Sequence, residues 1–141
     1  MNRMEEAELA DECERIVAPS RELDAAIARA VGYEVEWATI GPDHRREELV
    51  QVRTYPGEAA PTSRNLRRYT ASLDAAMTLV PEGCAINVVR TADGQSAHAN
   101  LYRFDGNSDC IPSAKFGGSA TTTALALCAA ALKSLAQKEG E

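Results

Sequence analysis

A lysine, two adjacent glycines and two hydroxyl side chains lie within seven positions of each other: Lys115, Gly117, Gly118, Ser119 and Thr121. The stretch that follows, 120–135, is rich in Ala and Leu and predicts a helix that is buried on nearly every side. The first turn of a helix has unpaired N–H groups and partial positive charge, and glycine lets the backbone approach a ligand closely. The spacing therefore predicts an anion site at this helix start. The alternative is a loop that ends in an ordinary Ser119 cap, because the G-x-x-x-x-G-K-[ST] pattern is absent.

A second cluster combines basic, aromatic and hydroxyl side chains: Arg64, Arg67, Arg68, Tyr69, Thr70 and Ser72. It comes just before another predicted helix start, where Ser72 is a suitable N-cap. Arginine binds phosphate through two parallel hydrogen bonds, and a tyrosine ring stacks on a base or closes a pocket wall. The alternative is a solvated basic turn that pairs with acidic residues. We expect the two clusters to meet at one rim and to bind an anionic group between them.

Other candidate sites are weaker. The stretch Asp105–Asp109 imitates the start of a calcium loop, but Cys110 stands where the glycine belongs and Phe116 where the bidentate glutamate belongs. We therefore interpret it as a polar turn. The two histidines, His44 and His98, lack further ligands at zinc-type spacing. We expect no metal, no cofactor and no catalytic residue.

The cysteines are far apart in the sequence and form no C-x-x-C pair: Cys13, Cys84, Cys110 and Cys128. This usage favours reduced thiols over a disulfide scaffold. A nucleophile pair of His98 with Cys84 or Cys110 is a remote alternative. The acidic stretch Met1–Glu14 has no apolar core and predicts no secretory signal, so we expect a cytosolic location.

Composition limits the function classes. The chain has 141 residues, of which 45% are hydrophobic and 5% aromatic, and we expect one domain over 1–141. The net charge of -6 argues against a protein that binds long nucleic acids, because these need a broad basic surface. No apolar run approaches the roughly 20 residues that cross a bilayer, so no membrane partner is expected. A core with few aromatic residues is thin, which favours a homo-oligomer.

Periodicity predicts four helices. The first, Met4–Val17, presents a solvated acidic face and is an addition, within residues 1–18, to the rest of the domain. A second helix is capped by Ser20 and ends at Gly32. A short third helix follows Ser72, and the last helix runs to about Gln137. The acidic face comprises Glu5, Glu6, Glu8, Asp11, Glu12 and Glu14.

Alternating hydrophobicity predicts two antiparallel hairpins. Tyr33–Ile40 pairs with Glu48–Tyr55, and Ala85–Thr91 pairs with Ser96–Phe104 through an Asp-Gly turn. The stretches 56–65 and 105–118 are expected to be loops, and Trp37 and Met77 to be core anchors. The order ααββαββα predicts an α+β fold, an α-β-α sandwich with about four strands in one mainly antiparallel sheet and about four helices.

Three stretches resemble a known family: Arg21–Ala28, Tyr69–Gly83 and Ala124–Leu132. Together they are similar to the phage ABA sandwich domain of phage and prophage accessory proteins, over most of 20–135. The resemblance implies an α-β-α sandwich in a phage-derived protein of the bacterial cytosol. It implies no activity, but small phage proteins of this kind are often immune-evasion factors, and some sequester nucleotide signals of host defence systems.

These observations favour a phage-derived, non-enzymatic binding protein that sequesters an anionic, nucleotide-like small molecule. Such a role needs tight binding without turnover, which suits a chain with no recognisable nucleophile, base or metal cluster. The alternative is an inhibitor that docks on a host defence enzyme through its acidic surface. A third hypothesis is a cyclic-nucleotide hydrolase.

Overall fold

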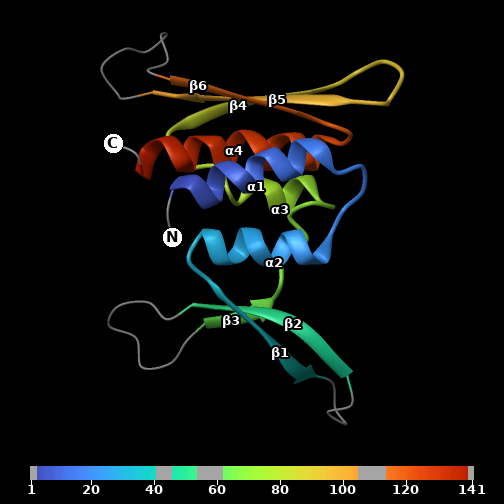
Figure 1. The fold of residues 1–141 in the computed structure, drawn as a ribbon, viewed down its shortest axis with the longest axis vertical. Helices are drawn as coiled ribbons and strands as arrows, with labels where there is room; N and C mark the ends of the chain where they lie inside the picture. Colours follow the sequence, from blue (N-terminus) through green and yellow to red (C-terminus); the bar gives the residue numbers. More distant parts are fainter. Residues whose placement is uncertain (1–2, 41–45, 54–61, 105–113, 140–141) are drawn as a thin grey trace.

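The computed structural model describes residues 3–40, 46–53, 62–104 and 114–139 (Figure 1). Within these ranges the chain forms four helices and two three-stranded antiparallel sheets. The elements in chain order are α1 (Arg3–Arg15), α2 (Arg21–Ala30), β1 (Glu34–Ile40), β2 (Arg46–Arg53), β3 (Thr62–Asn65), α3 (Leu73–Met77), β4 (Cys84–Arg90), β5 (Ala97–Arg103), β6 (Ala114–Ala120) and α4 (Thr123–Glu139).

The helices form the centre of the molecule and the two sheets lie outside them (Figure 1). The β4–β6 sheet, with strand order β4-β5-β6, covers one side of α1 and α4. The β1–β3 sheet, with order β1-β2-β3, lies on the other side, beyond α2. The α+β class and the antiparallel pairing are confirmed. The α-β-α sandwich with one sheet of about four strands is wrong, and so is the order ααββαββα, because the described order is ααβββαβββα.

Helix α4 explains why the helices are central. Between Ala124 and Leu132 no residue exposes more than 4% of its surface. A helix that is apolar on all sides cannot form an outer layer, because one of its faces would then meet water. Strand β5, in contrast, alternates buried Ala97 and Ala99 with exposed His98, so its sheet has one face for the core and one for solvent. The predicted burial of this helix is confirmed.

Local signals place most of the element ends. The Ser20 hydroxyl accepts a hydrogen bond from the Leu23 amide at 3.1 Å, and the Ser72 hydroxyl accepts one from Ala75 at 3.3 Å. Both are N-caps, as predicted. Gly94 has a φ of 72° in the turn between β4 and β5, a conformation that glycine adopts without strain.

Two strands were predicted as loops. Strand β3 lies in the predicted loop 56–65 and pairs with β2, placing Arg64 opposite Gln51. Strand β6 lies in part in the predicted loop 105–118 and pairs with β5, placing Lys115 opposite Tyr102. Each segment has a single β-branched or aromatic residue, Thr62 in β3 and Phe116 in β6, so its own sequence is a weak strand signal and pairing with a neighbour decides its conformation.

Helix α1 belongs to the core. Ala10 and Cys13 are fully buried, so α1 is not merely an addition to the domain. Glu6 is only 2% exposed, which contradicts its predicted place on a solvated face. Glu12 forms an ion pair with Arg15 on the same helix. Of the acidic residues whose side chains the structure describes, Glu8 and Asp11 are exposed as expected.

The expected core anchors Trp37 and Met77 are on the surface, with exposed fractions of 65% and 42%. Within the described ranges, no helix has both the length and the apolar character needed to cross a membrane. The predicted turn with His44, the loop at 56–61 and the polar turn 105–109 with Cys110 lie outside the described residues.

Candidate functional site

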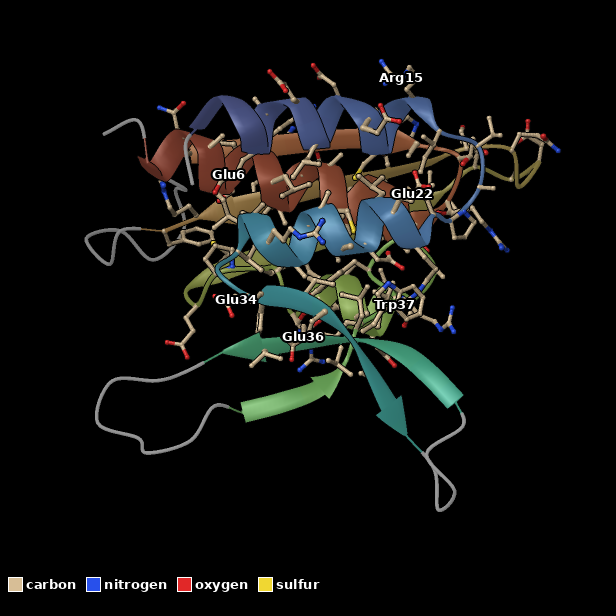
Figure 2. The ribbon with its side chains drawn as sticks, turned by 60° about the horizontal axis from the view of Figure 1, so that its bottom comes forward. Glu6, Arg15, Glu22, Glu34, Glu36 and Trp37 are labelled. Carbon is tan, nitrogen blue, oxygen red and sulfur yellow. The ribbon has the colours of Figure 1, made fainter. Side chains whose placement is uncertain are left out.

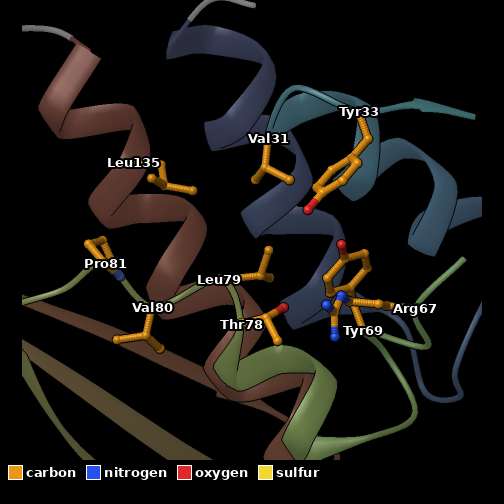
Figure 3. A pocket seen from close by; sticks show the side chains of 9 residues that line it. All are labelled: Val31, Tyr33, Arg67, Tyr69, Thr78, Leu79, Val80, Pro81 and Leu135. Carbon is orange, nitrogen blue, oxygen red and sulfur yellow. The ribbon is translucent and has the colours of Figure 1, made fainter. Parts of the chain in front are cut away.

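A cavity of about 260 Å³ lies where the end of α2, the segment before α3, the segment after α3 and the C-terminal part of α4 meet (Figure 3). We call it the Tyr69 cavity. Most of its wall is apolar, and its polar groups come from two tyrosines, one arginine and one threonine. The lining residues are Val31, Tyr33, Arg67, Tyr69, Thr78, Leu79, Val80, Pro81 and Leu135.

The polar side chains gather on one side of the Tyr69 cavity. Figure 3 shows the hydroxyl groups of Tyr33 and Tyr69 turned toward each other, with Arg67 next to Tyr69. In the part of the chain that the structure describes, no carboxylate pairs with the Arg67 guanidinium. This side of the cavity therefore carries a positive charge beside two aromatic rings, while the opposite wall is aliphatic.

Gln51, on β2, holds Arg67 and Tyr69 in place. Its side chain is fully buried, and its Oε1 accepts hydrogen bonds from the Arg67 amide at 3.0 Å and from the Tyr69 hydroxyl at 3.2 Å. Its Nε2 has no hydrogen-bond partner within the described ranges. Because one amide oxygen binds both neighbours, Gln51 sets the position of the Tyr69 hydroxyl relative to the chain at Arg67.

The Tyr69 hydroxyl remains protonated at neutral pH. Burial raises the pKa of this phenol, and the nearby Tyr33 raises it further, whereas the bond to Gln51 and the charge of Arg67 oppose the rise. A protonated phenol donates a hydrogen bond and does not act as a base. The Tyr69 hydroxyl already donates to Gln51, so the group of the cavity that suits a ligand is the permanent cation of Arg67.

A buried polar network fixes the chain next to Tyr69. Asp24 is 1% exposed, and its Oδ1 accepts hydrogen bonds from the Thr70 amide and hydroxyl, both at 2.8 Å. Its Oδ2 accepts one from Arg21 at 2.8 Å, and Arg21 also donates to the Leu66 carbonyl at 3.0 Å. The Thr70 hydroxyl is thus saturated inside the protein, which corrects its predicted role as a ligand-binding residue.

Other members of the predicted arginine cluster, residues 64–72, lie apart from the cavity. Ser72 caps α3, so its hydroxyl accepts from Ala75 and is not directed to a ligand. Arg68 is exposed and does not line the Tyr69 cavity. Arg64 is part of β3, and its side chain lies outside the described residues.

The predicted glycine cluster, residues 115–121, lies in a strand and not at a helix start. Gly117, Gly118 and Ser119 belong to β6, and the helix begins only at Thr123. The Ser119 amide does bind a carboxylate, but that carboxylate is Glu14 of α1, at 3.0 Å. The predicted anion site at Gly117–Ser119 is therefore wrong.

The remaining members of this cluster are also structural. The Lys115 ammonium lies 5.7 Å from the centre of the Tyr102 ring, on the sheet face away from the helices. The Thr121 hydroxyl donates to the Ile16 carbonyl at 3.4 Å. Gly118 lies so close to α4 that an added Cβ would overlap the Ala126 carbonyl oxygen. Gly118 thus serves helix–sheet packing, whereas Gly117 lies on the exposed face of the sheet.

Helix α4 separates the two clusters. On the side facing β6, Ala126 and Ala130 pack against Gly118. Cys128 projects on the other side, and its thiol donates to the Tyr69 carbonyl at 3.1 Å. Positions 126 and 128 lie about 200° apart around a helix, so the expected common rim does not exist.

A second cavity of about 410 Å³ lies between α2 and the β1–β3 sheet, where it borders on Trp37. Arg21 reaches it, but this guanidinium already binds Asp24 and the Leu66 carbonyl. The other two charged residues that line this cavity, Arg29 and Glu22, have charges of opposite sign. This groove therefore shows no preference for a charged ligand, unlike the Tyr69 cavity.

A catalytic arrangement does not emerge from the described residues. Cys84 packs against the core, while His98 lies on the opposite, exposed face of the β4–β6 sheet, so the predicted Cys84–His98 pair is wrong. The His98 Nδ1 lies 2.7 Å from the Ser119 hydroxyl, but this pair lies on an open sheet face. Within the described ranges no three His, Cys, Asp or Glu residues could hold a metal ion.

Sequence reasoning identified Arg67 and Tyr69 but missed the rest of the cavity. The sequence predicts Tyr33 as the first residue of the strand Tyr33–Ile40, and no signal in it brings Tyr33 next to Tyr69. Comparisons of the chain with protein-family models, with curated proteins and with solved structures find no match.

Proposed function

We propose that this chain is a non-enzymatic binding protein for a small anionic molecule with a planar ring. The observation that carries the proposal is the Tyr69 cavity, in which Arg67 lies beside two tyrosines and the remaining wall is aliphatic apart from Thr78. Ligand sites in proteins are typically such concave apolar surfaces with a few convergent polar groups. An anion would bind Arg67, while a ring would pack against the half-buried Tyr33 and the aliphatic wall.

The size of the cavity limits the ligand. At about 260 Å³ it is slightly smaller than common ligand pockets of about 300–1,000 Å³. It therefore suits one ring system with one anionic group, and a larger molecule would extend beyond it. A mononucleotide-like compound belongs to this class through its base and phosphate.

Sequestration in the host cytosol is the biological role that we attach to this binding. It requires affinity without turnover, and the polar groups of the cavity are suited to hold a ligand rather than to transfer a proton. The proposal depends on the cavity and not on the resemblance to phage domains, whose α-β-α layering differs from the layers described above. The alternative, docking through the acidic helix, is less favoured because Glu6 is buried and Glu14 binds Ser119 and Lys133.

Neighbouring arginines provide a matched test. We expect adenosine monophosphate or 4-hydroxybenzoate to raise the melting temperature of the wild-type protein, and Arg67→Ala to weaken binding about tenfold or more in calorimetry. Arg68→Ala removes the same charge one residue away, outside the cavity, and should retain nearly full affinity. Both variants should melt at the wild-type temperature without ligand.

Two results would contradict this function. Equal loss of affinity in both variants would show that only diffuse charge attracts the anion. If neither compound binds to the wild-type protein, the Tyr69 cavity is not a site of this class.

A further inference from the structure

The edges of the two sheets differ in how they are protected. Four strands lie at an edge, namely β1, β3, β4 and β6. An edge strand presents unpaired N–H and C=O groups that can pair with a strand of another chain. Proteins commonly prevent this with charged side chains, with very short edge strands or by covering the edge.

Three of the four edges show such a protection. Strand β1 exposes Glu34 and Glu36, which extend from the sheet (Figure 2). Strand β3 has only four residues. Strand β6 is covered, because Lys133 donates to the Gly117 carbonyl at 2.7 Å while Glu14 accepts from the Ser119 amide.

Strand β4 has none of these protections. It is seven residues long, has no proline, and carries a single charge, on its last residue Arg90. Among the described residues β5 is its only strand partner. Within the described ranges, no other strand pairs with this fourth edge.

The register shows which backbone groups of β4 point outward. The Ser119 amide binds Glu14 and therefore points away from β5. Ser119 and His98 lie opposite each other, so they form a non-hydrogen-bonded pair. The backbone N–H and C=O groups of His98 therefore point toward β4. His98 pairs with Val89, so Val89 and every second residue before it bond to β5. The alternate residues Ile86, Val88 and Arg90 direct their N–H and C=O groups away from β5, toward the edge.

The side chains along this edge are apolar and incompletely covered. Ile86 and Val88 pack against the core but remain half-buried, and Val89 on the other face is 50% exposed. A further strand beside β4 would bond to the free backbone groups and would also cover these side chains.

We infer that a second copy of this chain pairs with β4 in antiparallel fashion and joins the two β4–β6 sheets into one six-stranded sheet. Each copy has a net charge of -6, so two copies repel each other over most of their surfaces. Strand β4 contains no acidic residue, which makes it a favourable place for two such chains to meet.

In this dimer the two-fold axis passes between the two Asn87 residues, so that all seven positions of β4 lie opposite positions of β4 in the partner subunit. Ile86 then lies opposite Val88 of the partner subunit, in a hydrogen-bonded pair. The two Arg90 side chains lie at opposite ends of the β4–β4 strand pair, so like charges are not adjacent. Asn87 faces Asn87 of the partner subunit on the exposed side of the sheet.

The first test is the mass of the wild-type protein in solution, by light scattering after size exclusion at micromolar concentration. We expect a dimer, and we expect Asn87→Lys to yield a folded monomer because two lysines would face each other at the axis. The control is Asn100→Lys, one strand further from the edge on the same face, which should remain dimeric. A wild-type monomer at all concentrations would overturn the inference, as would a dimer that Asn87→Lys leaves intact.

Cysteine crosslinking tests the register in a Cys84→Ser background. Asn87→Cys should form a disulfide-linked dimer on oxidation, because directly opposed Cα atoms of a non-hydrogen-bonded pair are about 4.5 Å apart. Ala85→Cys should not form this disulfide, because the two residues 85 of the dimer lie four positions apart along the paired strands, a distance of about 13 Å. Equal crosslinking of both variants would contradict this pairing. Neither experiment alters the Tyr69 cavity, so its outcome is independent of the proposed ligand.

Discussion

The segments 66–72 and 115–121 have similar residue types but different structural roles. Both combine basic and hydroxyl residues directly before a helix. The first wraps around buried Asp24 and leaves Arg67 and Tyr69 at a cavity. The second is a strand whose glycine allows α4 to approach the sheet closely.

The difference shows that residue types near a helix start do not by themselves indicate an anion site. The backbone groups of the second segment already bind Glu14 and Lys133. In the first segment the bond to Gln51 uses the Arg67 amide and leaves its guanidinium without a carboxylate partner among the described residues. What separates a site from a structural segment is which groups the tertiary contacts have already used.

The largest expected effect on stability concerns Asp24, whose carboxylate binds the segment 66–72. Asp24→Ala leaves Arg21 and the Thr70 amide without their buried partner, so we expect a loss of about 3–5 kcal/mol in the free energy of unfolding by urea. Glu22→Ala, an exposed control on the same helix, should change it by no more than about 1 kcal/mol. A small effect of Asp24→Ala would mean that segment 66–72 does not depend on this network.

The two glycines of the second segment provide the next test. In Gly118→Ala the new Cβ overlaps the Ala126 carbonyl and lies 2.9 Å from both Ala129 Cβ and Ala130 N, so we expect a loss of roughly 1–3 kcal/mol or more. In Gly117→Ala the nearest atom, Asn100 Oδ1, is 3.4 Å away. This control should remain within about 0.5 kcal/mol of the wild type, or become slightly more stable. Equal effects of the two substitutions would contradict the close packing of α4 on β6.

The smallest effect concerns Tyr69 and depends on pH. Tyr69→Phe removes the hydrogen bond to Gln51, so we expect a loss of about 1 kcal/mol at pH 7. Burial raises the pKa of Tyr69 above its usual value of 10.0, so the folded state holds this proton more tightly than the unfolded state. The resulting stability is complete below pH 10 and is lost as the pH rises through the folded-state pKa.

The wild type should therefore lose more stability than Tyr69→Phe between pH 9 and 11, measured by urea denaturation. Tyr102→Phe is the control from the β4–β6 sheet, where the ring lies below Lys115. A constant difference between wild type and Tyr69→Phe across this range would show that the phenol is not buried.

The sequence predicted two of the nine residues that line the Tyr69 cavity. Arg67 and Tyr69 could be named because arginine beside an aromatic residue is a recognisable ligand signal. Tyr33 and Leu135 could not, since they lie more than thirty positions from Tyr69 and only packing brings them to it. Arg68 could not be distinguished from Arg67, because neighbouring residues of the same type differ only in the direction of their side chains.

The sequence by itself determined the helices, their caps and the two hairpins, because these depend on side-chain periodicity and on turn residues within a few positions. It also determined that α4 must be buried, since that helix has no wide polar face. Only the tertiary structure decided that the helices lie between two sheets and that 114–120 is a strand. Strand pairing and layer order depend on contacts between distant residues, such as Gly118 with Ala126 and Ser119 with Glu14, for which the local sequence carries no signal.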